Sequence, residues 1–404
     1  MNYDKPEQGE SLEKRGKREI SCKNPQKIDC GKATSFKEWK MKAKNPKITE
    51  LFSKLLLKWN QEKNTRQMPW KGEKDPYKIW LSEIILQQTR VEQGLSYYKN
   101  FIRNFPDVHK LAAASESSVF KLWEGLGYYS RCRNLIASAK FISTECKGVF
   151  PDTYESIRAL KGVGPYTAAA IASFAYNLPY AVLDGNVFRV LARVFGSNIA
   201  IDSSEGKKHF AGLAEKLLDK NKPGIYNQAI MDFGAVICKP VSPGCSTCVF
   251  NKHCVAYLTN KVNELPVKEK KTQVRKRWFF YLVMEYKNRV AVRQRTGKDI
   301  WQGLYDFPMI ETGNESTPEE IIKKAIKNKW LQEGGYTIAA LSGIYKQQLS
   351  HRFIAGRFIN IHCRKKPVLP QEFTWLEKKE INKYAFPQLI NQFLKKELKQ
   401  QALF

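Results

Sequence analysis

The sequence lacks any apolar run of about 18 residues, the length that a membrane-spanning helix needs. Its first stretch, MNYDKPEQGESLEKRGKREI, also lacks the apolar segment of a secretory signal peptide. We therefore expect a cytoplasmic chain that does not cross a membrane. The 9 cysteines of such a chain are expected to be reduced or metal-bound rather than paired in disulfides.

Acidic residues are scarce relative to basic ones. The chain has 39 Asp and Glu against 68 Lys and Arg, which gives a formal net charge of +29. This excess goes beyond what solubility requires and predicts a polyanionic partner, usually nucleic acid, although a merely basic surface is the alternative. With 43% hydrophobic residues, the 404-residue chain is expected to be globular and to form two or three domains.

Alternation with a period of two is nearly absent from the first half of the chain. Apolar residues instead recur with helical spacing, as in ITELFSKLLLKW from Ile48 to Trp59, which predicts an all-α domain. Beyond a charged linker the period changes, and RWFFYLVMEYKNRVAVRQR reads as two strands joined at Lys287 and Asn288. Helices at about 318–332 and 387–397 complete an α+β domain. The expected divisions are a basic flexible tail (1–46), the all-α domain (47–258), the linker (259–275) and the α+β domain (276–404).

Four cysteines gather in the segment CKPVSPGCSTCVFNKHC, which spans residues 238–254 and closes the all-α domain. Thiolates that converge in this way bind a soft metal centre. Structural zinc usually takes two close cysteine pairs, whereas here only Cys245 and Cys248 form one, and the outer two stand further away. The spacing favours a 4Fe–4S cluster held by four cysteines, with zinc as the alternative.

Two acidic residues have apolar neighbours. Glu83 lies within KIWLSEIILQQTRV, where desolvation would raise the pKa of its carboxyl and suit a general acid. A position on the polar stripe of that helix is the alternative for Glu83. Asp184 follows a short apolar run and precedes a helix, so it is either a functional carboxylate or a helix N-cap.

Three further stretches are typical of contacts with nucleic acid. Gly162 and Gly164 in LKGVGPYTAAA permit a tight turn between two helices, with backbone N–H groups directed outward toward a phosphate. The stretch GLGYYSRCRNL interleaves tyrosines and arginines, as in proteins that wedge into a duplex, or else forms a tyrosine pair in the core. Residues 87–89, QQT, offer amide and hydroxyl groups that reach base edges.

In this order, these stretches resemble the helix–hairpin–helix DNA glycosylases, specifically the MutY-type adenine glycosylases. The resemblance covers residues 47–258 closely and 276–404 more loosely. It implies two all-α lobes with the reacting bond in the cleft between them, near the hairpin. It also implies a chiefly structural 4Fe–4S cluster on Cys238, Cys245, Cys248 and Cys254.

The resemblance further implies a monomeric enzyme of base excision repair, whose substrate is double-stranded DNA with adenine opposite 8-oxoguanine or guanine. The adenine is flipped out of the stack, Glu83 protonates it, and Asp184 stabilises the resulting sugar cation. Tyr166 and Asn186 orient these groups. The positions that the resemblance assigns to DNA and lesion contacts are Gln88, Thr89, Tyr128, Gly162, Gly164, Ser350 and His351.

One position separates this family from its relatives of the endonuclease III type. Those relatives place a lysine two residues after the second hairpin glycine, where it forms a Schiff base and cuts the strand. Here that residue is Tyr166, which cannot form an imine, so we expect a monofunctional glycosylase. A bifunctional lyase and a non-catalytic lesion-binding protein are the alternatives.

The second domain resembles the Nudix-like module with which the family recognises 8-oxoguanine. Its landmarks are IWQGLYDFP and QLSHRF, and the chain has Leu349-Ser350-His351 where the family has Phe-Ser-His. The aromatic contact is thereby lost, while the hydroxyl and the imidazole are kept. The Glu-rich signature of Nudix hydrolases is missing after GLYDFP, so we expect no nucleotide hydrolysis.

Overall fold

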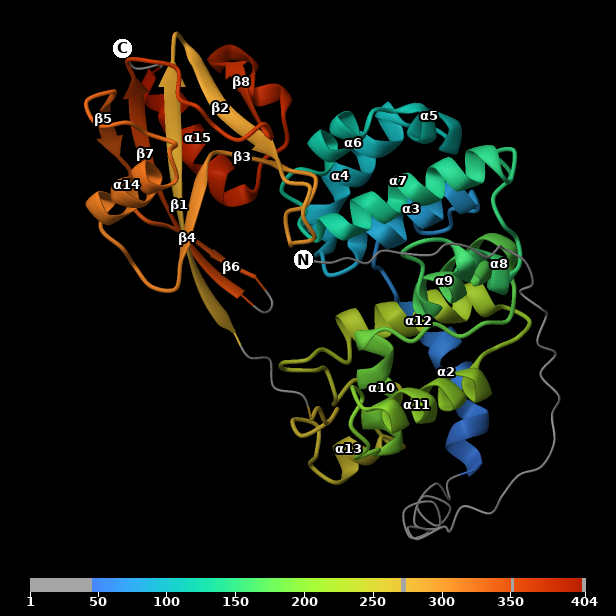
Figure 1. Ribbon diagram of the computed structural model, residues 1–404. Coiled ribbons are helices and arrows are strands. Elements are labelled where there is room, and N and C mark those ends of the chain that lie inside the picture. The colour runs from blue at the N-terminus through green and yellow to red at the C-terminus, as the bar shows by residue number, and fades with distance from the viewer. Residues whose placement is uncertain (1–45, 270–273, 350–351, 402–404) are drawn as a thin grey trace, which may run out of the picture. The chain divides into compact units, whose positions relative to one another are not determined.

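The computed structural model describes residues 46–269, 274–349 and 352–401 (Figure 1). The expected basic tail up to residue 45 and the recognition residues Ser350 and His351 lie outside the described residues. None of the described helices combines the length and the apolarity that crossing a membrane requires.

A succession of helices runs from Pro46 to Leu258, as the helical spacing predicts. Several starts have a local cause: Asp75 caps α3 and Asp184 caps α10, while proline occupies the first turn of α3, α9 and α12. The helices are α2 (Pro46–Lys63), α3 (Pro76–Leu86), α4 (Val91–Asn104), α5 (Val108–Ala113), α6 (Glu116–Trp123), α7 (Tyr129–Thr144), α8 (Tyr154–Ala159), α9 (Pro165–Tyr176), α10 (Gly185–Phe195), α11 (Ser204–Leu217), α12 (Pro223–Val236) and α13 (Val255–Leu258).

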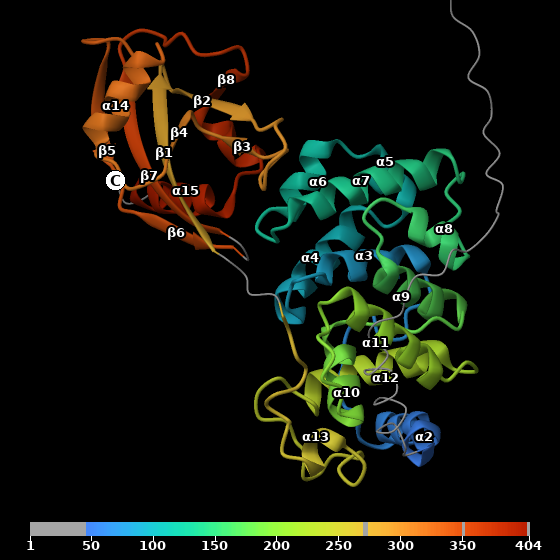
Figure 2. The same ribbon diagram turned by 60° about the horizontal axis from the view of Figure 1, so that its bottom comes forward.

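These helices enclose two hydrophobic cores. Buried residues of α3 to α9, including Trp80 and Trp123, belong to the first core. The second core joins α2 to α10, α11 and α12 through residues such as Phe52 and Phe233. The chain therefore starts in one lobe, crosses to the other through residues 64–75 and returns at α10 (Figure 2). Two lobes were expected, and the crossings bring distant segments together at their junction.

The hairpin between α8 and α9 needs glycine at one position. Gly162 has φ +81°, and a Cβ added there would lie 2.7 Å from the Cβ of Asn134 on α7. Gly164 is the N-cap of α9 with φ −90°, and a Cβ there would meet nothing within 4 Å. The turn therefore requires glycine at Gly162 but not at Gly164, whose backbone is extended and whose surroundings are open.

The second domain is an eight-stranded mixed sheet in the described part of the chain. Its main strand order is β3-β2-β1-β7-β5; β4 pairs with β1, β6 with β7 and β8 with β2. The long strands β1 and β7 are parallel, and the other pairs are antiparallel. The strands are β1 (Arg275–Tyr286), β2 (Arg289–Gln294), β3 (Tyr305–Asp306), β4 (Met309–Thr312), β5 (Tyr336–Leu341), β6 (Tyr345–Gln348), β7 (Arg352–Cys363) and β8 (Phe373–Glu377).

Strand β1 shows the period-two alternation that the sequence predicts. Phe280, Leu282 and Met284 share a core with α14 (Pro318–Lys327), whereas Phe279 and Tyr281 belong to the core that contains residues of α15 (Gln388–Gln401). A 3-10 helix, η1 (Lys378–Lys383), follows β8. The expected fold class, an all-α domain followed by an α+β domain, is confirmed.

Candidate functional site

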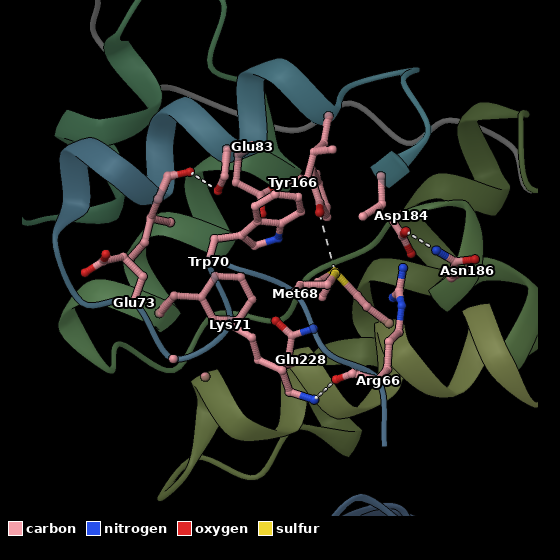
Figure 3. A pocket seen from close by; sticks show the side chains of 18 of the residues that line it. Arg66, Met68, Trp70, Lys71, Glu73, Glu83, Tyr166, Asp184, Asn186 and Gln228 are labelled. Atoms are coloured by element: carbon pink, nitrogen blue, oxygen red, sulfur yellow. Dashed lines mark hydrogen bonds between the residues drawn. The ribbon is translucent and has the colours of Figure 1, made fainter. Parts of the chain in front are cut away.

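A pocket of about 760 Å³ opens where the two lobes meet. Its walls come from α3, the start of α9, the start of α10, α12 and the non-helical segment 66–74 (Figure 3). Glu83, Tyr166, Asp184 and Asn186 all line this pocket. The structure thus brings together four residues, the first and last of which lie more than a hundred positions apart in the sequence.

Glu83 is 8% exposed, so its position on a polar helix face is excluded. It lies on α3 among Trp80, Leu81 and Ile84, which pack into the core of the first lobe. Burial raises the pKa of Glu83 to about 7, and the nearby Asp184 adds to the rise, whereas the hydrogen bond with Tyr166 opposes it. At neutral pH the carboxyl therefore exchanges readily between its acid and base forms.

Tyr166 stands between the two carboxyl groups, in the first turn of α9. Burial, followed by the charges of Glu83 and Asp184, raises the pKa of Tyr166 well above its ordinary value, so the phenol keeps its proton. Its hydroxyl donates to Sδ of Met231 at 3.4 Å and also interacts with Glu83. A phenol has one proton to donate, so the thioether and the carboxylate compete for it.

Asp184 is an N-cap, as its alternative interpretation held, and it also faces the pocket. Its Oδ1 accepts from the backbone N–H of Val187 at 2.8 Å, and its Oδ2 accepts from Nδ2 of Asn186 at 2.7 Å. Burial raises the pKa of Asp184, and these two hydrogen bonds oppose the rise. The pKa values of both carboxyls are therefore raised, because both groups are desolvated.

A chain of hydrogen bonds connects Asp184 to the cysteine segment. Asn186, which donates to Asp184, accepts from Nη2 of Arg189 at 2.8 Å. Nε of the same guanidinium donates to the carbonyl oxygen of Cys238 at 2.7 Å, and Nη2 also donates to that of Gly234. Arg189 is 8% exposed, and it ties the start of α10 to the end of α12. No pattern in the sequence pointed to this role of Arg189.

The four cysteines of the segment line one small cavity. The backbone N–H of Phe250 points at Sγ of Cys248 at 3.4 Å, and Nη1 of Arg193 points at Sγ of Cys238 at 3.5 Å. Donors aimed at sulfur suit thiolates that ligate a metal centre, so the residues fit a cysteine-bound cluster. Within the described ranges, no group of three or more His, Cys, Asp or Glu side chains is arranged to hold a single metal ion.

Among the residues predicted to touch DNA, two line the pocket and Tyr128 is exposed. Gln88, with φ 58°, and Thr89 line the pocket beyond the end of α3. Tyr128 precedes α7 with φ 46° and is 46% exposed, whereas Tyr129 is buried in the core. The core interpretation is therefore confirmed for Tyr129, while the contact of Tyr128 with DNA stays a prediction.

The interpretation of the interleaved arginines as DNA contacts is wrong for Arg131. It is 8% exposed, and its Nη1 donates to the carbonyl oxygens of Ile84 and Ile85 at 2.8 and 3.0 Å. These carbonyls belong to the last turn of α3, where a cation is favourable because they lack helical partners. Arg131 thus fixes the end of the helix that carries Glu83.

Sequence reasoning missed one wall of the pocket. Arg66, Met68, Trp70 and Lys71 line it from the segment between α2 and α3, and Gln228 lines it from α12. Nothing in the spacing of these residues assigned them a role.

Comparison with known proteins locates the two domains in sequence families. Residues 81–216 match the HhH-GPD superfamily of base excision DNA repair proteins, and residues 279–396 match the NUDIX domain. Two similar proteins are adenine DNA glycosylases of Buchnera aphidicola. The one from subspecies Acyrthosiphon pisum is 35% identical, over 66% of this chain and 76% of its own length. The one from subspecies Baizongia pistaciae is 34% identical, over 75% of this chain and 84% of its own length.

The adenine DNA glycosylase of Mus musculus is similar over a shorter stretch. It is 41% identical over 52% of this chain and 42% of its own length.

Proposed function

Because the chain belongs to the family of MutY-type adenine DNA glycosylases, we propose that it removes adenine opposite 8-oxoguanine or guanine from double-stranded DNA without cutting the strand. The family makes it a DNA glycosylase, a hydrolase of N-glycosyl bonds in base excision repair. The observation that carries the finer proposal is the pocket in which Glu83, Tyr166 and Asp184 meet.

In the proposed reaction the flipped adenine enters this pocket and receives a proton on N7 from Glu83. The C1′–N9 bond then breaks, and its electron pair leaves with the protonated base. Asp184 faces the sugar cation that remains, and its carboxylate stabilises the positive charge until water adds at C1′ and gives its proton to the carboxylate of Glu83. The raised pKa of Glu83, about 7, supports its role as the acid.

A 4Fe–4S cluster on Cys238, Cys245, Cys248 and Cys254 belongs to the same proposal. Its part would be structural, because four thiolate bonds to one group hold the segment 238–254 in a single conformation. Arg189, which donates to the Cys238 carbonyl, connects that segment to Asn186 in the pocket.

Recognition of the lesion is assigned to the second domain, with Ser350 and His351 as its reading groups. In the first domain, we assign Gln88, Thr89 and Tyr128 to the DNA beside the lesion. The hairpin at Gly162 and Gly164 is assigned to a phosphate, because the first turn of α9 directs backbone N–H groups away from the helix.

A single-turnover assay on a duplex with one adenine opposite 8-oxoguanine tests the reaction type. Strand breakage is expected only after treatment with alkali, because Tyr166 offers no amine for a Schiff base. Breakage without alkali, together with a protein–DNA adduct trapped by borohydride, would identify a lyase instead. If no product forms under either condition, the alternative of a non-catalytic lesion-binding protein holds.

The Tyr166→Phe variant tests whether the protonated form of Glu83 sets the rate of adenine release. The hydrogen bond from Tyr166 favours the ionised carboxyl and so lowers its pKa; its loss should raise that pKa further above 7. The rate of adenine release falls as Glu83 deprotonates, so the alkaline limb of the pH–rate profile should move to higher pH in the variant. An unchanged alkaline limb in single-turnover rates from pH 6 to 9 would separate Tyr166 from the acid.

A further inference from the structure

Asp232 is a carboxylate that the proposed mechanism leaves unused. It lies on α12 with a fully buried side chain, beside the pocket, and four donors saturate its two oxygens. Nη1 of Arg66 and Nε2 of Gln228 donate to Oδ1 at 2.8 and 3.0 Å. Nδ2 of Asn64 and Nζ of Lys71 donate to Oδ2 at 2.9 and 3.0 Å. An ionised carboxylate, which only accepts, satisfies all four.

Two of these donors come from the non-helical segment 66–74 that forms one pocket wall, and a third, Asn64, lies between the end of α2 and that segment. Asn64, Arg66 and Lys71 each bind Asp232, and Nζ of Lys71 also donates to the carbonyl oxygen of Arg66 at 3.0 Å. The segment has no helix or strand to hold it, so these bonds fix its path. Met68 and Trp70, which lie between the anchored residues, face the pocket as a result.

The fourth donor is Gln228, and its hydrogen bond with Asp232 decides which atom of its amide faces a base in the pocket. Gln228 lies one helical turn before Asp232, so the two side chains share a face of α12. Only the NH₂ end of its amide can face the carboxylate, because the carbonyl end would place two acceptors together. The oxygen Oε1 is therefore the end left for the pocket, where Gln228 lies across from Glu83 (Figure 3).

We propose that Asp232 is a positioning residue that sets base specificity, by holding Gln228 with its acceptor toward the pocket. The inference rests on the proposed function and deepens it. An acceptor at this position pairs with the 6-amino group of adenine and is repelled by the 6-oxo group of hypoxanthine or guanine. A buried acceptor left facing another acceptor loses its hydrogen bond, which makes discrimination strong.

Asp232→Asn tests the inference with almost no change in shape. An asparagine amide can turn its own NH₂ toward Gln228, which frees the Gln228 amide to present NH₂ to the pocket instead. The substrates are duplexes with adenine or hypoxanthine opposite 8-oxoguanine, which differ at position 6 and share N7. We expect the ratio of the two single-turnover rates, adenine over hypoxanthine, to fall at least ten-fold.

Arg66→Gln is the matched control. It removes one ion pair from Asp232 and one anchor from the wall, yet leaves the anion that faces Gln228. It should slow both bases alike and keep their ratio. Gln228→Leu removes the amide itself, so it should lower the ratio about as much as Asp232→Asn does, and the double variant should lower it no further than Gln228→Leu alone.

The outcomes separate the two proposals. If the wild type releases adenine but Asp232→Asn slows both bases equally, or the two substitutions lower the ratio multiplicatively, Asp232 is only structural and the inference fails. If the wild type releases no adenine, the proposed function itself fails. Should Asp232→Asn not bind DNA with an abasic analogue, and so be misfolded, Gln228→Leu decides alone: an unchanged ratio overturns the inference.

Discussion

Glu83→Gln is expected to abolish adenine release and, at the same time, to make the folded protein more stable above pH 7. Loss of a general acid typically costs a factor of about 10² to 10⁴ in rate, and glutamine has no proton to give to N7. The shape of the pocket is preserved, because glutamine and glutamic acid have nearly the same volume. Single-turnover release from adenine opposite 8-oxoguanine measures the first effect.

The gain in stability follows from the raised pKa of Glu83. Folding moves this pKa from 4.5 to about 7, so the unfolded chain ionises first as the pH rises. The wild type therefore loses stability between these two values, by about 3 kcal/mol in total, and the neutral glutamine variant does not. Urea unfolding at pH 8 should favour the variant, and the difference should vanish near pH 4.

Glu62→Gln is the control for this experiment, because Glu62 is an exposed residue of α2 away from the pocket. It should leave both the rate and the pH dependence of stability unchanged. A Glu83→Gln variant that is no more stable at pH 8 than the wild type would show that the carboxyl is well solvated. It would contradict a raised pKa for Glu83 and its role as the general acid.

Arg189→Gln is expected to slow adenine release by about 10- to 100-fold, although Arg189 is not expected to touch the substrate. Its loss leaves Oδ1 of Asn186 and the carbonyl oxygens of Gly234 and Cys238 without their donor. Asn186 is then free to turn away from Asp184, which loses a hydrogen bond that stabilises its charge.

The neighbouring Arg193 is a matched control for Arg189. It is also buried and binds the same cysteine segment, through the carbonyl oxygen of Lys239 and Sγ of Cys238. It donates to the carbonyl oxygen of Leu265 as well, but it has no hydrogen bond with Asn186. Arg193→Gln should destabilise the fold to a similar extent while the folded fraction keeps its rate. Rates are normalised to active sites by titration with DNA. Equal slowing in both variants would refute a specific path from Arg189 to Asp184.

The parts of the site that the sequence predicted correctly are those with a local signal. The burial of Glu83 follows from the tryptophan, leucine and isoleucines around it, and the position of Asp184 before α10 follows from a short apolar run that ends at a capping residue. The turn at Lys287 and Asn288 joins β1 to β2 because both residues adopt positive φ, as such hairpins require.

The parts that were missed have no such signal. Strand β5 is exposed along most of its length, so it shows no alternation of apolar and polar residues. Segment 66–74 has neither helical nor strand periodicity, and its place in the pocket depends on Asp232. Three of the four partners of Asp232 lie 161 to 168 residues away in the sequence, a pairing that no local pattern reveals.

The separation in sequence between Asp232 and its partners affects the order in which the protein folds during its synthesis on the ribosome. The pocket wall around Trp70 is synthesised early, but the carboxylate that anchors it arrives some 160 residues later, with α12. Until then Asn64, Arg66 and Lys71 lack the carboxylate that accepts their hydrogen bonds. Helix α2 also lacks most of the helices that form its core. The nascent chain can therefore complete the lobe of α3 to α9 first, as domains do during synthesis, and only then close the base pocket. Catalytic competence is thus among the last properties that the emerging glycosylase domain acquires.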